Sequence, residues 1–312
     1  MSASTNTEAE ASKPSQPVNA ADDTLSAESK RVGDQYGSLE SRILWDWLCG
    51  GNRHMAYYEA GTWWPFPLSE GQERMQGKLL EALGLPPGSR VLDAGCGDGY
   101  VAMHLARRGS LHVTAFDVVD RHVANARRNV DAAGLGGRVT AMHLGFDQLG
   151  TIPDASHDGI YTSEALVHAS DPARVLREFL RILKPGGRIV LHEYHNDFMD
   201  AKVVGFPAEI ARMKTNVAPQ EGDSNTPAFV RVKTYFTKVM SKTGFENIVV
   251  RNYSSNIEPM ARLLSISAWW RYIVLLFHLQ RFFPNSATRA EGYVGQEHWA
   301  YVSVSGTKPM IK

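Results

Sequence analysis

The segment VLDAGCGDG, residues 91–99, constrains this chain more than any other part of the sequence. Asp93 ends a short apolar run, and three glycines follow at alternate positions before a helical pattern begins. Glycine lets the backbone adopt a positive φ angle and pass close to a ligand. The free N–H groups at a helix start can also receive a carboxylate or a phosphate. The segment therefore predicts a strand, a tight glycine turn and a helix.

A second acid follows the glycine turn at a characteristic sequence spacing. Asp117 ends the next apolar run, 20 residues after Gly97. This spacing is typical of a carboxylate that binds the hydroxyls of a ribose. A glycine turn by itself can also be a plain strand-to-helix connection. The acids on both sides of it favour a site for a nucleotide-like cofactor.

Strand and helix patterns alternate through the middle of the chain. The helix that begins near Pro172 has Asp171 as its N-cap, a stripe of apolar residues and Pro185 as its stop signal. Alternation of this kind predicts an α/β fold, a doubly wound Rossmann-like parallel sheet with helices on both faces. The predicted strands cover residues 91–94, 112–116, 139–143, 159–162, 188–193, 248–252 and 299–305.

The remaining segments suggest three further parts. Residues 1–35 are rich in Ser and Ala and contain no aromatic residue, which predicts a flexible tail. Residues 36–88 carry two helical patterns and an aromatic patch, and we expect an N-terminal helical lid there. Residues 89–312 then form the sheet domain, with cap insertions at about 196–230 and 256–294.

Composition excludes several classes of protein. Lys plus Arg and Asp plus Glu both number 33, so the net charge is zero and general nucleic-acid binding is not expected. Two cysteines exclude a disulfide framework and a cysteine-rich metal site. Arg271 and Arg281 interrupt the most apolar segment, residues 263–283, so we expect no transmembrane helix. The two cysteines favour a reducing compartment, and we expect a cytoplasmic location. His192 and His195 would project to opposite faces of a strand, so we expect no metal there.

Three segments together carry a resemblance to a known family. VLDAGCGDG, FDVVD (residues 116–120) and LKPGGRIVLHEYH (residues 183–195) resemble the class I S-adenosylmethionine-dependent methyltransferases. YYEAGTWWPFPLSEGQERM and SEALVHASD are similar to the sterol and tocopherol methyltransferase group. WLCGGNRHMAYY, together with FDVVDRHVANARRN, resembles fungal secondary-metabolite methyltransferases, including the N-methyltransferases of gliotoxin-like pathways.

The resemblance implies S-adenosyl-L-methionine as cofactor and assigns parts of it to residues. The glycine turn would lie beside the methionine moiety, with Asp93 near its amino group. Asp117 would bind both ribose hydroxyls, Val118 would pack on the adenine, and Asp147 would contact the adenine amino group. The expected cofactor-binding residues are Tyr58, Asp93, Gly95, Cys96, Gly97, Asp117, Val118 and Asp147.

Three residues are candidates for catalysis. Methyl transfer needs a base only where the attacking atom must lose a proton. His168 follows the fourth predicted strand and could accept that proton, although a capping or surface role is equally consistent with its position. The resemblance implies that Glu164, like Tyr58, would lie near the donor methyl or the methionine end. Glu193 matches the family's acid at the end of the fifth strand, whereas His192 fits a structural role better.

These observations predict a methyltransferase that acts on a nitrogen or oxygen of a hydrophobic small molecule in secondary metabolism. Carbon methylation of a sterol or isoprenoid is the alternative within the same class. A nicotinamide-dependent oxidoreductase would also use the glycine turn and Asp117, and a binding protein without turnover is a third possibility. The aromatic run at residues 269–277 predicts a cap helix over the pocket, or else contact with a membrane surface.

Overall fold

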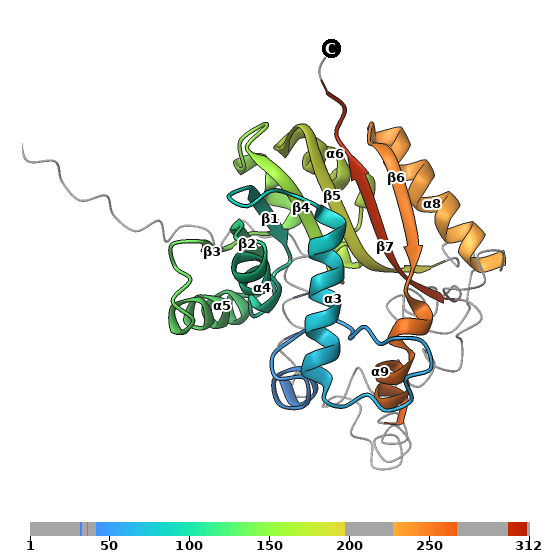
Figure 1. The fold of residues 1–312 in the computed structure, drawn as a ribbon. Helices are drawn as coiled ribbons and strands as arrows, with labels where there is room; N and C mark the ends of the chain where they lie inside the picture. Colours follow the sequence, from blue (N-terminus) through green and yellow to red (C-terminus); the bar gives the residue numbers. More distant parts are fainter. Residues whose placement is uncertain (1–31, 33–35, 37–41, 197–226, 267–298, 311–312) are drawn as a thin grey trace, which may run out of the picture.

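A seven-stranded sheet forms the centre of the computed structural model, which describes residues 32, 36, 42–196, 227–266 and 299–310 (Figure 1). The strand order is β3-β2-β1-β4-β5-β7-β6. The strands are β1 (Arg90–Ala94), β2 (His112–Asp117), β3 (Val139–His143), β4 (His157–Ser163), β5 (Leu183–Asn196), β6 (Glu246–Asn252) and β7 (Trp299–Thr307). This confirms the predicted α/β class and the predicted strands.

One strand departs from the parallel sheet that the sequence predicts. β1 to β5 pair in parallel, but β7 lies antiparallel between β5 and β6. The irregularity between β4 and β5 is a second departure, since the pairing jumps from Leu183 to Arg188. The KPGG segment fills this jump, and Gly186 adopts a φ of 76° within it.

The helices follow the predicted alternation. They are η1 (Arg42–Leu48), α3 (Leu68–Leu83), α4 (Tyr100–Arg108), α5 (Asp120–Ala132), η2 (Phe146–Thr151), η3 (Leu166–His168), α6 (Pro172–Ile182), α8 (Pro227–Thr243) and α9 (Ser254–Ile266). The side chain of Asp171 accepts a hydrogen bond from the N–H of Arg174 at 2.9 Å, which confirms the predicted N-cap of α6. α9 was not predicted as a helix, because the sequence pattern there was assigned to a cap insertion.

Two apolar cores lie on opposite faces of the sheet. One joins the sheet to α6 and α8 through residues such as Phe179 and Met240, both fully buried. The other joins it to α3, α4 and α5 through residues such as Leu83, Ala102 and Val123. Burial of apolar surface on both faces explains why the strands read as nearly continuous apolar runs.

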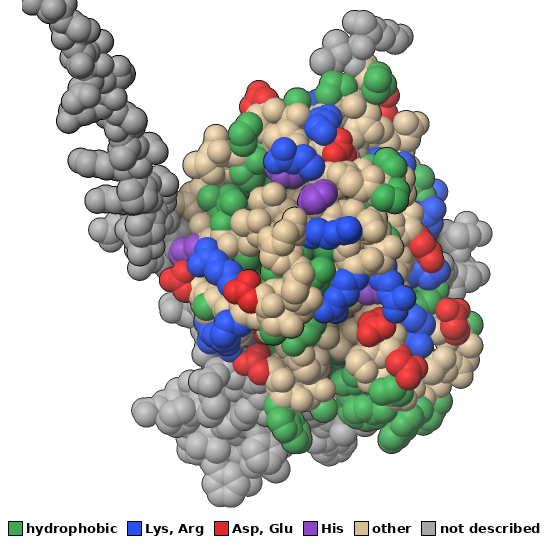
Figure 2. All heavy atoms as spheres, turned by 60° about the vertical axis from the view of Figure 1, so that its left-hand side comes forward, with side chains coloured by type: hydrophobic (Ala, Val, Ile, Leu, Met, Phe, Trp, Pro, Cys, Tyr) green, Lys and Arg blue, Asp and Glu red, His purple; other side chains and the backbone are tan. Residues whose placement is uncertain are grey.

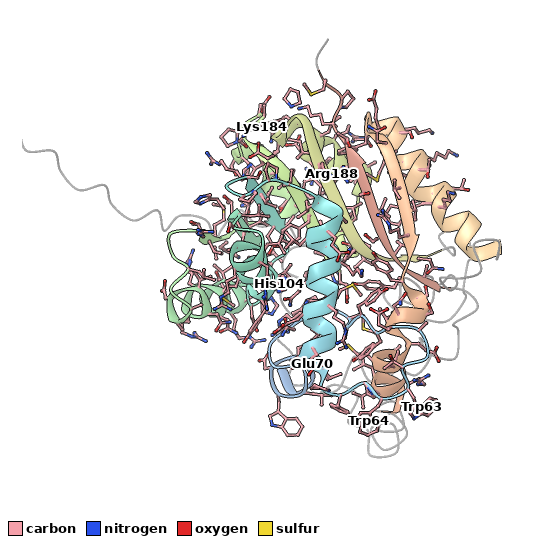
Figure 3. The ribbon with its side chains drawn as sticks, viewed as in Figure 1. Trp63, Trp64, Glu70, His104, Lys184 and Arg188 are labelled. Carbon is pink, nitrogen blue, oxygen red and sulfur yellow. The ribbon has the colours of Figure 1, made fainter. Side chains whose placement is uncertain are left out.

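The N-terminal segment forms a third cluster with α9. Tyr57, Tyr58 and Met75 pack there with Ile257 and Met260. The aromatic patch of the predicted lid therefore consists of a buried part and an exposed part. Tyr57 and Tyr58 are buried, whereas Trp63 and Trp64 are 73% and 65% exposed and point outward below α3 (Figure 3).

The described surface carries charged side chains of both signs. Basic and acidic side chains are intermingled on the face shown in Figure 2, in keeping with the zero net charge. Within the described residues, no helix is long and apolar enough to cross a membrane. Most of the predicted tail, both predicted cap insertions over most of their length, and the aromatic run at 269–277 lie outside the described residues.

Candidate functional site

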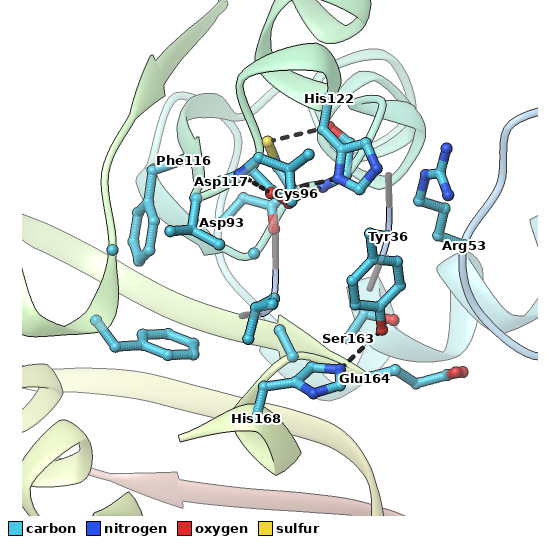
Figure 4. A pocket seen from close by; sticks show the side chains of 18 of the residues that line it. Tyr36, Arg53, Asp93, Cys96, Phe116, Asp117, His122, Ser163, Glu164 and His168 are labelled. Atoms are coloured by element: carbon cyan, nitrogen blue, oxygen red, sulfur yellow. Dashed lines mark hydrogen bonds and ion pairs between the residues drawn. The ribbon is translucent and has the colours of Figure 1, made fainter. Parts of the chain in front are cut away.

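A pocket opens where β1, β2 and β4 end, at the edge of the sheet that carries the glycine turn (Figure 4). Parallel strands bring their carboxyl ends to one edge, and ligands of open α/β sheets bind there. Seven of the eight predicted cofactor residues line this pocket, as do Glu164 and His168. The seven are Asp93, Gly95, Cys96, Gly97, Asp117, Val118 and Asp147.

The glycine turn has the geometry that its sequence predicts. Gly95, Gly97 and Gly99 all adopt positive φ angles, of 93°, 52° and 84°. A Cβ atom on Gly95 would lie 2.3 Å from the Cβ of Ala165, so a side chain cannot fit at this position. The N–H groups of Gly95 and Cys96 donate to the carbonyl of Phe116 at 2.9 and 2.8 Å. These bonds fix the turn against the end of β2.

Asp117 is the anchor of this end of the pocket. Its carboxylate accepts hydrogen bonds from the N–H groups of Gly97 and Val119, each at 2.8 Å. Nδ1 of His122 lies 3.3 Å from the same carboxylate. Burial raises the pKa of Asp117, but the hydrogen bonds and the charge of His122 outweigh burial and hold this pKa below its ordinary value. The side chain is therefore an anion at neutral pH, which is consistent with the predicted role of accepting hydrogen bonds from ribose hydroxyls.

Asp93 contrasts with Asp117. It is 1% exposed, and its Oδ2 atom has no hydrogen-bond partner within the structure. Burial raises the pKa of Asp93 to about 7; the hydroxyl of Tyr161 opposes this rise, and the charge of Asp117 adds to it. An approaching cation would favour the ionised form of this carboxyl group.

An aromatic wall lies beside Asp147 on the other side of the pocket. The rings of Phe116 and Phe146 meet edge to face, with centroids 5.9 Å apart, and both residues line the pocket. Val118 also lines the pocket, and its carbonyl accepts a hydrogen bond from Nε2 of His143 at 2.9 Å. The wall is apolar with one acid near its rim, which suits a flat nitrogen heterocycle.

Glu164 joins three parts of the chain on the side of the pocket away from Asp117 (Figure 4). Its Oε1 accepts hydrogen bonds from the N–H of Met55 at 2.6 Å and from the hydroxyl of Tyr301 at 2.9 Å. Its backbone adopts a φ of 57°, a conformation that non-glycine residues seldom adopt. Strain of this kind is often found at functional positions.

The predicted base His168 is held by a residue that the sequence did not single out. Nε2 of His168 and the hydroxyl oxygen of Tyr36 are 2.7 Å apart (Figure 4). The ring of Tyr36 also meets His122 edge to face, with centroids 5.8 Å apart. Tyr36 and Val32 both line the pocket, although Val32 falls within the predicted tail. Nothing in the sequence around these two positions signalled a pocket.

Two predicted site residues lie elsewhere. Tyr58 is buried behind α3, and its hydroxyl donates to the carbonyl of Pro65 at 2.7 Å. Glu193 is 1% exposed and accepts hydrogen bonds from the hydroxyl of Thr162 and from the N–H groups of the loop at 165–167. Neither side chain is part of the pocket lining. Glu193 thus supports the wall that presents Glu164 and His168.

His192 is also structural in its placement. It is fully buried, and its ring meets those of Tyr253 and Tyr301 edge to face. Burial lowers the pKa of His192 to about 3, so this ring is neutral. Among the described residues, no group of His, Cys, Asp and Glu side chains is arranged to hold a metal ion.

Comparison with known proteins identifies the family. The methyltransferase domain family matches residues 92–191, the part of the chain from β1 to β5. The S-adenosyl-L-methionine-dependent Diels-Alderase iccD of Talaromyces variabilis is 34% identical over 288 residues, which cover 91% of this chain and 96% of that protein. The chain belongs to the S-adenosyl-L-methionine-dependent methyltransferase family. This membership favours the methyltransferase interpretation of the glycine turn over the nicotinamide alternative.

Two further similarities concern one relative and one solved structure. The S-adenosyl-L-methionine-dependent Diels-Alderase iliD of Neonectria sp. (strain DH2) is 45% identical over 159 residues, which cover 51% of this chain and 60% of that protein. The crystal structure of the [4+2]-cyclase SpnF aligns with a TM-score of 0.69 at 24% identity, covering 91% of this chain and 97% of that one. This last similarity establishes the fold alone.

Proposed function

We propose that this methyltransferase-family chain binds S-adenosyl-L-methionine and catalyses a [4+2] cycloaddition in secondary metabolism. The similarity to iccD over almost the whole length of both chains carries the proposal. The substrate would be a hydrophobic small molecule that contains a conjugated diene and an alkene. In such a reaction the diene and the alkene join in a ring. No methyl group is transferred to the substrate, and no proton leaves it.

The pocket offers a suitable group for the ribose, the adenine and the ammonium group of the cofactor. Asp117 provides an ionised acceptor for ribose hydroxyls, and the wall of Phe116 and Phe146 provides an apolar surface for adenine. Oδ2 of Asp93 is a buried acceptor that lacks a partner and suits an ammonium group. When bound, the cofactor supplies a sulfonium charge to the pocket. Asp93, Gly95, Cys96, Gly97, Asp117, Val118 and Asp147 are the residues that would hold it.

The candidate proton acceptors also favour a reaction that needs no base. His168 lies against the hydroxyl of Tyr36, and Glu164 holds Met55 and Tyr301. Glu193 supports the loop and does not line the pocket. A cycloaddition requires instead that the diene and the alkene be held in the reactive geometry, and such positioning can lower a barrier by several kcal/mol, up to ~10.

Methyl transfer to a nitrogen or oxygen is the second candidate. The observation that favours it is the presence of Glu164 and His168 in the pocket that also contains the glycine turn. In that case His168 would act as the base, and its replacement by Ala would reduce turnover by roughly 100-fold or more. A cycloaddition would lose much less on the same replacement.

Mass spectrometry separates the two candidates. The protein is incubated with methyl-labelled S-adenosyl-L-methionine and a linear polyene that carries a conjugated diene and an electron-poor alkene. We expect a cyclic product of the same mass as the substrate, formed faster than without protein, and no label in it. Asp117→Ala is the matched control, since weak cofactor binding should remove the acceleration. A labelled product one methylene heavier would refute the proposal and support methyl transfer.

A further inference from the structure

Arg53 is a buried cation with unused hydrogen-bonding capacity. Its side chain is 8% exposed, and its Nη2 atom lies 2.5 Å from Oδ1 of Asp46 and 3.4 Å from Oδ2 of Asp98. Its Nε and Nη1 atoms are buried and have no hydrogen-bond partner. A guanidinium group offers five N–H donors, and leaving a buried donor unpaired is unfavourable.

The position of Arg53 shows where these donors lie. Arg53 follows the N-terminal helix η1 and lines the pocket beside Tyr36 (Figure 4). Its aliphatic stem covers the glycine turn, since a Cβ atom on Gly97 would lie 3.2 Å from the Cδ of Arg53. The unpaired donors therefore belong to the end of the pocket where the turn passes the ligand. This is the end opposite the aromatic wall of Phe116 and Phe146.

Both acidic partners of Arg53 are shared with other donors. Asp46 is shared, because Nη1 of Arg121 lies 2.7 Å from its other oxygen. Asp98 is shared as well, since it accepts a hydrogen bond from Asn125 at 3.1 Å. The two aspartates thus divide their charge among several donors, and the Nε edge of Arg53 stays free for an acceptor in the pocket.

We propose that Arg53 binds the carboxylate of the cofactor's methionyl group through its Nε and Nη1 donors. This inference rests on the proposed binding of S-adenosyl-L-methionine. A guanidinium group matches a carboxylate in plane and spacing, so two parallel hydrogen bonds can form. Asp46 belongs to η1 and Asp98 to the glycine turn, so Arg53 also joins the N-terminal lid to the turn around this carboxylate.

A matched pair of ligands tests the assignment without a measurement of turnover. Decarboxylated S-adenosylmethionine differs from S-adenosyl-L-methionine only by the missing carboxylate. Calorimetric titration of the wild-type chain should show S-adenosyl-L-methionine binding roughly 10- to 100-fold tighter than the decarboxylated form. Arg53→Gln should reduce this preference to about 3-fold or less, because the loss falls on the ligand that has the carboxylate.

Two further variants separate binding from structural support. Arg121→Gln breaks the neighbouring ion pair with Asp46, and Arg121 is not itself a lining residue, so this variant should keep the wild-type preference. Arg53→Lys keeps the charge without the planar fork, and its preference should fall between wild type and Arg53→Gln. Retained binding of the decarboxylated form by Arg53→Gln shows that this variant is folded.

The possible failures are distinguishable. If Arg53→Gln weakens both ligands equally, Arg53 only holds the lid, and the inference is wrong. If the wild-type chain binds both ligands equally, the carboxylate has no such partner and the inference is again wrong. If the wild-type chain binds neither ligand, the proposed function fails and the inference fails with it.

Discussion

The two ends of the pocket are built over very different distances along the chain. At the glycine turn, Asp117 accepts from Val119 and Gly97, which are 2 and 20 residues away. At the other end, Glu164 holds Met55 and Tyr301, which are 109 and 137 residues away. The first end is a property of one strand-turn-helix unit and its neighbouring strand. The second exists only when the N-terminal segment around Met55, the end of β4 and β7 meet.

The difference also appears in how the buried acids are used. Asp117 and Asp93 face the pocket beside the turn, one with a lowered pKa and one with a pKa raised to about 7. The carboxylates of Glu164 and Glu193 accept hydrogen bonds from groups of the surrounding segments and so hold this part of the pocket in shape. One end of the pocket is therefore equipped to bind charge, while the other is equipped to keep its shape.

The largest expected effect comes from a change beside Glu164, at the end of the pocket that depends on contacts between distant segments. Glu193→Ala removes the acceptor for four hydrogen bonds from Thr162 and the loop at 165–167. We expect the free energy of unfolding to fall by about 4 kcal/mol, because buried donors are left unpaired. Chemical denaturation measures this change. Glu178→Ala, which removes a partly exposed ion pair with Arg181, should cost less than about 1 kcal/mol; equal losses would contradict the supporting role of Glu193.

The next change tests the local end. Asp117→Ala removes the ionised acceptor and also releases the N–H of Gly97. We expect the affinity for S-adenosylhomocysteine to fall by roughly 100-fold, as for loss of a charged hydrogen-bond acceptor. Calorimetry measures the affinity, and Asp131→Ala, which replaces an exposed acid on α5, is the control that should change nothing. Unchanged affinity in Asp117→Ala would refute the ribose assignment.

A smaller effect sharpens the contrast between the two aspartates. Since the pKa of Asp93 is about 7 in the free chain, acidification below pH 7 protonates it and removes an acceptor for the cofactor's ammonium group. The affinity for S-adenosyl-L-methionine should then fall by up to about tenfold per pH unit, and Asp93→Asn should make it independent of pH in this range. Titrations from pH 5 to 8 test this, and a flat wild-type profile would contradict it.

The same shift in Asp93 has an opposite sign for folding. The folded chain binds this proton more tightly than the unfolded chain, whose ordinary value is 3.8. The contribution of Asp93 to stability is therefore greatest at low pH and declines as the pH rises from about 4 to about 7. Asp93→Asn removes this decline from the denaturation profile of the free chain.

The smallest effect concerns one link of the long-range end. Tyr301→Phe deletes the hydroxyl that donates to Glu164 but leaves the bond from Met55. We expect a loss of about 1 kcal/mol in unfolding free energy. In a Glu164→Gln background the same change should cost less, since the two side chains are coupled. Additive losses would show that the contact between them contributes nothing.

The sequence predicted the elements better than their arrangement. The observed strands contain the predicted ones and extend most of them by a few residues, because apolar runs and glycine or proline breaks are local signals. The antiparallel β7 was missed, since the direction of a strand depends on its path through space rather than on its composition. α9 was missed because its pattern was assigned to an insertion.

The same division holds for the candidate site. Asp93, the glycine turn and Asp117 were predictable, since one short segment and a fixed spacing specify them. Tyr58 and Glu193 were expected in the pocket and lie behind it, because burial cannot be read from a residue's place in a motif. Arg53 and Tyr36 were not expected at all, and His122 could have been noticed from its place five residues after Asp117.

By itself, the sequence determined the α/β class and the residues of a charged cofactor end, because apolar periodicity, the glycine turn and its spacing to Asp117 are local signals. Only the tertiary structure decided what surrounds the other end of the pocket. There the partners of Glu164 and His168 come from segments that the sheet brings together. Hydrogen bonds between such distant groups depend on the folded path of the chain, and no local pattern encodes them.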